Sequence, residues 1–138
     1  MMTVLLVGVP EGEALERLRS GIQRNPHFRV VSHAQDPVVA LAHARVLLPD
    51  ITVLSLPPGS ESLDAVPDAL GVFHGVRALD PPSGVVLRTA AAAVPRAMSG
   101  LTVEGAVHVV REGDAEGLMR ALRTIGRRRA SCDPDGMR

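Results

Sequence analysis

Ser55 is the residue whose type and position best suit it to chemistry in this sequence. It follows the apolar run Ile51 to Leu54, which lies between Pro49-Asp50 and Pro57-Pro58 and is typical of one buried strand feeding a turn. Strands buried on both faces are typical of the middle of a parallel sheet, and ligands bind at the carboxyl ends of such strands. We therefore take the end of this strand as the candidate site.

The residues around the two nucleophile candidates do not indicate an enzyme. Ser55 is flanked by Val53 and Pro57, so it lacks the Gly-x-Ser-x-Gly elbow of hydrolases. The single cysteine, Cys132, has no base placed near it by the sequence. We expect no catalytic residues, although an unrecognised enzyme remains an alternative because fold alone does not fix function.

Cofactor and metal signatures are also missing from the sequence. Pro10 and Glu11 follow the glycine at position 8 and crowd the space that a dinucleotide pyrophosphate would need. The histidines do not have ligand-like spacing, and we therefore expect neither a metal site nor a cofactor. The histidines concerned are His27, His33, His43 and His74.

The composition limits the class of protein. With 138 residues the chain is one domain, and 46% hydrophobic residues with zero net charge exclude a disordered chain. Because basic and acidic residues are equal in number, the composition gives no indication of the basic surface that binds nucleic acid. No apolar run approaches the roughly 20 residues of a membrane span, and Val4 to Val9 is too short for a signal peptide. A single cysteine cannot form an internal disulfide, so we expect a cytoplasmic protein.

Strand-like and helix-like segments alternate along the chain. Strands are predicted at 3–7, 28–32, 51–55, 84–89 and 106–110. Asp36 and Asp114 are predicted to cap helices, and Val38, Leu41, Ala42 and Leu48 are expected to line one side of the second helix. The alternation predicts an α/β fold, a flavodoxin-like, doubly wound five-stranded parallel sheet in the order 2-1-3-4-5. We expect one domain over residues 1–129 and a flexible tail over 130–138.

Five phrases in order carry a resemblance to a known family. They are "TVLLVG", "NPHFRVVSHAQDP", "LPDITVLSLPPG", "GVVLRTA" and "EGAVHVVREGDAEGLMRAL". Together they resemble the receiver domains of two-component response regulators, and most closely the nitrate-responsive and LuxR type. The resemblance runs from Thr3 to about Gly126.

The resemblance implies a role for each position of the receiver site. Receivers use an aspartate acceptor, an acidic pair that holds Mg²⁺, a hydroxyl and a lysine, because cations must offset the repulsion between two anions. Here the acidic pair falls on Gly8 and Val9, the acceptor on Ser55, the hydroxyl on Thr89, the lysine on Arg111 and the aromatic switch on His108. The resemblance therefore implies a pseudo-receiver, and aspartates at positions 8, 9 and 55 are expected to rebuild the ligand set.

By the same resemblance, the chain is expected to act in two-component signalling as an atypical, phosphorylation-independent response regulator. It would associate with a protein partner or form a homodimer through the face of the fourth helix, fifth strand and fifth helix. Matching positions include Met98, Glu116, Arg120 and Arg123. No DNA-binding module follows the last helix, so direct transcription control would need further residues. The alternative is a small-molecule sensor using a vacant pocket between Gly8, Ser55 and Thr89.

Overall fold

The computed structural model describes residues 1–57, 66–90 and 107–132, with side chains described as far as residue 128. The strands are β1 (Met2–Val7), β2 (Phe28–Ala34), β3 (Ile51–Ser55), β4 (Gly84–Thr89) and β5 (Val107–Arg111). The helices are α1 (Glu13–Gln23), α2 (Pro37–Leu47), α3 (Pro67–Arg77) and α5 (Ala115–Cys132). None of the helices in these described parts is long and apolar enough to cross a membrane.

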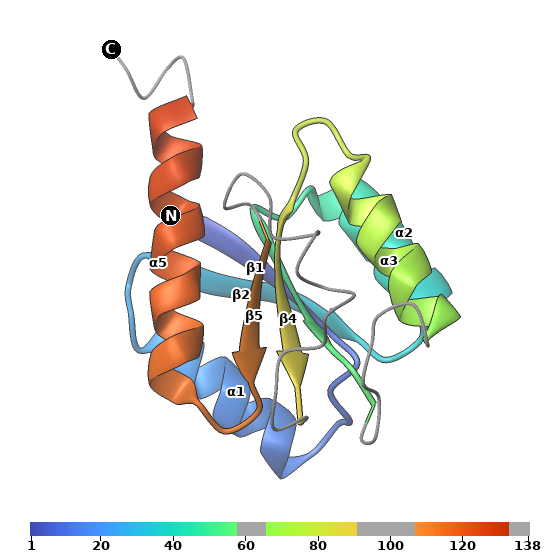
Figure 1. Cartoon of the computed structure of the whole chain (residues 1–138), viewed down its shortest axis with the longest axis horizontal. Helices are drawn as coiled ribbons and strands as arrows, with labels where there is room; N and C mark the ends of the chain where they lie inside the picture. Colours follow the sequence, from blue (N-terminus) through green and yellow to red (C-terminus); the bar gives the residue numbers. More distant parts are fainter. Residues whose placement is uncertain (58–65, 91–106, 133–138) are drawn as a thin grey trace.

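All five strands form one parallel sheet in the order β2-β1-β3-β4-β5, as predicted. Helices α1 and α5 cover one face of the sheet, and α2 and α3 cover the other (Figure 1). Alternate side chains of each central strand therefore enter two separate cores. Leu5 and Leu54 pack with α2 and α3, whereas Leu6 and Val53 pack with α1 and α5.

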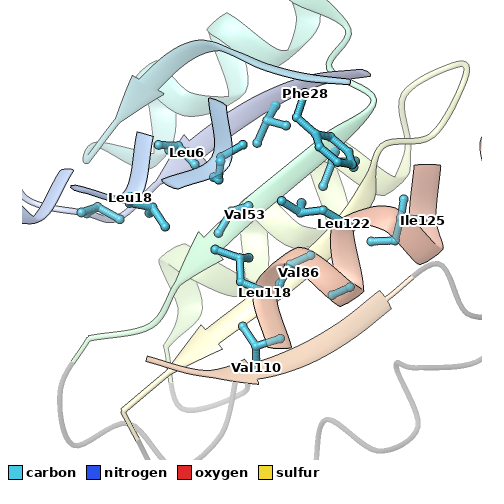
Figure 2. Close-up of a cluster of buried hydrophobic side chains, with 14 of the residues drawn as sticks. Leu6, Leu18, Phe28, Val53, Val86, Val110, Leu118, Leu122 and Ile125 are labelled. Atoms are coloured by element: carbon cyan, nitrogen blue, oxygen red, sulfur yellow. The ribbon is translucent and has the colours of Figure 1, made fainter. Parts of the chain in front are cut away.

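The core on the α1 and α5 side is shown in Figure 2, where Leu18 of α1 and Leu118, Leu122 and Ile125 of α5 lie over the sheet. Leu122 is fully buried. In both helices the apolar residues recur every three or four positions, which places them on the side that packs against the sheet. This layer fixes α1 and α5 relative to the carboxyl ends of β3, β4 and β5.

The second helix begins as predicted but packs differently. Asp36 caps α2, since its carboxylate accepts hydrogen bonds from the backbone amides of Val38 and Val39 at 2.7 and 3.1 Å. The buried residues of α2 are Ala40 and Ala44, whereas Val38 is 76% exposed and Val46 81% exposed. The prediction for the packed side is wrong for Val38, Ala42 and Leu48, which are exposed. It is confirmed for Leu41, which packs against the core. The small alanines form the buried side of the helix, so that it packs closely against its neighbours. The larger residues on the opposite side therefore face water.

Helices α2 and α3 pack closely at Gly75. The methyl end of the Leu41 side chain occupies the space that a Cβ of Gly75 would take. A side chain at position 75 would therefore require Leu41 to change its conformation.

The last helix is longer than predicted. The Asp114 carboxylate caps it by accepting a hydrogen bond from the amide of Gly117 at 2.9 Å. The helix continues to Cys132, three residues past the predicted domain end at 129, because Ala130 and Ser131 do not interrupt it. Residues 133–138 of the predicted tail, and the predicted weak helix with Met98, lie outside the described residues.

Candidate functional site

The residues singled out by the sequence converge at the carboxyl edge of the sheet. Ser55 ends β3 and lies in register with Arg88 of β4, and Thr89 ends β4 in register with Arg111 of β5. Gly8 follows β1 directly, and its amide donates a hydrogen bond to the carbonyl of Ala34 at 2.9 Å. Parallel strands place all these termini on one edge, which is where α/β folds bind ligands.

Gly8 lies in close contact with the backbone of Ser55. Its φ is +86°, a conformation that residues with a side chain rarely adopt, and an ideal Cβ at this position would lie 2.5 Å from the carbonyl oxygen of Ser55. A side chain here would be strained and would require the backbone to shift. The expectation that aspartates at positions 8, 9 and 55 rebuild the ligand set stays a prediction, and this strain would oppose it.

Val9 belongs to the hydrophobic core. It is 4% exposed and lies in the cluster between the sheet, α1 and α5, together with Leu15 and Leu118. A carboxylate at this position would enter an apolar layer and lose its hydration. The residue at the second position of the acidic pair, Val9, is therefore part of the hydrophobic core.

Thr89 is also enclosed, with 3% exposure. Its carbonyl accepts a hydrogen bond from the amide of Glu112 at 2.7 Å, which ties the end of β4 to the turn after β5. Thr89 is thus buried, and Gly8 lies against the backbone of Ser55. The small-molecule pocket expected between these three positions stays a prediction.

Arg88 is the site residue that the sequence analysis missed. Its guanidinium Nη1 donates a hydrogen bond to the Ser55 hydroxyl at 3.2 Å, and the side chain is half-buried. A signal was present in the sequence, since "GVVLRTA" contains one charged residue within an otherwise apolar strand. A charged residue on a buried strand needs a partner or an opening to solvent, and it therefore marks a candidate site.

Arg88 also borders a large cavity between α1 and α5. The cavity has a volume of about 1110 Å³, and Arg111 lies at the same end as Arg88, beside the start of α5. A second, smaller cavity of about 340 Å³ lies at the β5 edge, and it is lined by His108, Arg120 and Thr124. Arg111 lines both cavities, whereas His108 lines only the smaller one.

The predicted interface residues on α5 lie on one side of the helix, since Glu116, Arg120 and Arg123 all line the cavity that faces α1. Glu116 and Arg123 line the cavity that faces α1, whereas Arg120 borders both cavities. Met98 lies outside the described residues. Among the predicted site and interface residues, His108, Arg111 and Arg120 line the smaller cavity at the β5 edge, and the predicted interface as a whole stays a prediction. The described residues also contain no group of three or more histidine, cysteine or acidic side chains placed to hold a metal ion.

Comparison with solved structures reveals the same fold in several signalling proteins. The response regulator domain of Thermotoga maritima CheB aligns with a TM-score of 0.65 at 16% identity, covering 91% of this chain and 96% of that one. A LuxR-family response regulator from Aurantimonas gives 0.69 at 23% identity, covering 90% and 84%. The signal receiver domain of an HD domain-containing protein from Pseudomonas fluorescens gives 0.71 at 19% identity, covering 94% and 98%.

The chain has the fold of a receiver domain. No family model matches the sequence, and no curated protein matches it either. The predicted sheet order and the receiver resemblance are thus confirmed at the level of fold.

The side chains at the expected site differ from those that receiver domains use for phosphoryl transfer. The two positions that would hold acidic metal ligands are a backbone contact at Gly8 and a core residue at Val9. The acceptor position carries Ser55, whose hydroxyl faces the Arg88 cation. A positive charge and a hydroxyl remain at this edge, but no described carboxylate occupies the expected acidic positions.

Proposed function

We propose that this chain is a signalling domain with the receiver fold that acts without accepting a phosphoryl group. The observation that supports the proposal is the position of Gly8 beside the Ser55 carbonyl oxygen, because a residue with a carboxylate at the first metal-ligand position would require the backbone to shift. Without carboxylates at positions 8 and 9 the expected Mg²⁺ ligands are missing, and a serine hydroxyl is a weak nucleophile at neutral pH unless a base lies beside it. We infer no catalytic role, and we place the protein in the cytoplasm.

The proposed mode of action is association with a protein, either a partner or a second copy of the chain. Exposed apolar side chains on α2 support this, since Val38, Val39, Val46 and Leu47 are all exposed. Clusters of exposed large apolar residues commonly mark protein contacts. The receiver resemblance favours a different surface for a homodimer, the β5 side of α5, where His108 and Arg120 lie.

Sedimentation velocity distinguishes these surfaces. We expect the wild-type chain to form a dimer, and Arg120→Glu to raise the dimer dissociation constant by about tenfold, because a reversed charge at a contact costs roughly 1.4 kcal/mol. Arg29→Glu is the matched control, since Arg29 is exposed on β2 at the opposite edge of the sheet. It should leave the dissociation constant unchanged.

Two results would contradict the predicted dimer face. If Val46→Asp on α2 separates the dimer while Arg120→Glu does not, the association surface is α2. If the wild-type chain is monomeric at every accessible concentration, homodimerisation is wrong and a different protein must be the partner.

A further inference from the structure

The cavity between α1 and α5 carries an excess of positive charge. Six arginines line it, against three carboxylates at the corner between β5 and α5. One of these carboxylates, Asp114, is already engaged in capping α5. The arginines come from both walls and from the sheet edge, and they are Arg17, Arg24, Arg88, Arg111, Arg120 and Arg123. Such a surface attracts anions, because the charges of both walls add within the cavity.

The base of the cavity is apolar. Leu18 of α1 and Leu118 of α5 line it and are 9% and 6% exposed, and Met119 lies beside them, partly buried against the same core. Figure 2 shows Leu18 and Leu118 on facing helices above the strands. A molecule in this cavity would therefore meet apolar side chains along its length and cations around its rim and at one end.

Arg88 at that end lacks a carboxylate partner within the part of the chain that the structure describes. The ion pairs found there are Arg17 with Glu13 and Arg19 with Glu16, and both lie on α1. The contact of Arg88 with Ser55 uses one of the five N–H groups of the guanidinium. A half-buried guanidinium satisfied by a neutral hydroxyl is well suited to bind a further anionic group in bidentate fashion.

We propose that the cavity between α1 and α5 binds an organic anion of small-molecule size. Its carboxylate, sulfonate or phosphate group would pair with Arg88, and its apolar body would lie on Leu18, Leu118 and Met119. The volume of about 1110 Å³ lies slightly above the range of small-molecule sites, roughly 300–1,000 Å³, so the cavity has room for a ligand of that size. Because the same guanidinium contacts Ser55, occupancy of the cavity is coupled to the carboxyl edge of the sheet. This inference does not require the chain to form a dimer, although Arg120 of the predicted dimer face also lines the cavity.

The fluorescent probe 8-anilinonaphthalene-1-sulfonate tests the proposal, since it joins an anion to an apolar body. Titration into the full chain should give saturable emission at one site, and decanoate should displace the dye. The neutral analogue N-phenyl-1-naphthylamine should bind about tenfold more weakly, because it lacks the charge that pairs with Arg88. Rising salt should weaken the dye but not the neutral analogue.

Dissociation constants of the dye for substituted chains show which residues it contacts. Arg88→Gln should raise its dissociation constant by about tenfold, since a charge-assisted bidentate contact is replaced by a neutral one. Met119→Glu, which adds a carboxylate beside the apolar base, should weaken binding by a similar factor and provides a second test if Arg88→Gln disturbs the fold. Arg29→Gln repeats the chemical change at the far edge and should bind as the wild type does.

Three results would overturn the proposal. The first is equal binding of the dye and its neutral analogue. The second is loss of emission on Val46→Ser, which would place the dye on the exposed face of α2. The third is displacement by a poly-glutamate peptide at concentrations where decanoate has no effect, since this would make the cavity a protein-docking surface.

Discussion

Replacing Gly8 with alanine should lower the free energy of unfolding by about 2–5 kcal/mol, and aspartate should cost at least as much. Two terms add to this loss. A side chain at a φ of +86° costs about 1–2 kcal/mol, and relief of the overlap with the Ser55 carbonyl oxygen costs about 1–3 kcal/mol. Urea denaturation with linear extrapolation measures the sum.

Gly113→Ala is a closely matched control for Gly8→Ala. Gly113 has a φ of +91°, and nothing lies within 4 Å of an added Cβ. Its free energy of unfolding should therefore fall only by the cost of the backbone conformation, about 1–2 kcal/mol. If the two variants are destabilised equally, the contact with Ser55 contributes nothing, and the steric argument against an acidic ligand at position 8 fails.

Replacing Val9 with aspartate should cost about 3–5 kcal/mol at neutral pH, because the carboxylate would be buried without a partner. Val9 is 4% exposed within an apolar cluster. Burial raises the pKa of such a carboxyl, so the folded state binds its proton more tightly than the unfolded state does. The deficit relative to wild type should shrink as the pH falls and be largest at and above neutrality.

The control is Val9→Thr, which has nearly the same shape and adds one hydroxyl. It should cost about 1–3 kcal/mol, with no dependence of the deficit on pH. Parallel urea titrations at pH 5 and pH 7.5 separate the two variants. Equal stability of Val9→Asp and Val9→Thr at pH 7.5 would mean that position 9 can hold a charge, and that the acidic pair could be rebuilt.

The fold could be predicted from the sequence because its signals are local. Strands buried on both faces appear as continuous apolar runs, and Asp36 and Asp114 mark helix starts with side chains that bond to the first free amides. The packed side of α2 could not be predicted in the same way. Ala40 and Ala44 are weakly hydrophobic, and only the close approach of neighbouring elements reveals that they are buried while Val38 and Val46 are exposed.

The candidate site was predicted in position but not in geometry. The sequence placed Ser55, Thr89 and Arg111 at one edge, since strand order and strand ends determine that edge. It could not show that Gly8 touches the Ser55 carbonyl, because that contact joins residues 47 positions apart through the pairing of β1 and β3. The hydrogen bond between Arg88 and Ser55 also could not be predicted, because it depends on the register of β3 and β4 and on the conformation of the Arg88 side chain.

Intact mass spectrometry after incubation with acetyl phosphate and Mg²⁺ tests the central claim most directly. The account predicts no mass increase for the wild-type chain, since Ser55 has no adjacent base and the metal-ligand positions are Gly8 and Val9. Ser55→Asp alone should also remain unlabelled, because an anionic acceptor without a metal would repel the incoming phosphate. A Mg²⁺-dependent gain of one phosphoryl group on the unmodified chain, mapped to Ser55, would contradict the account.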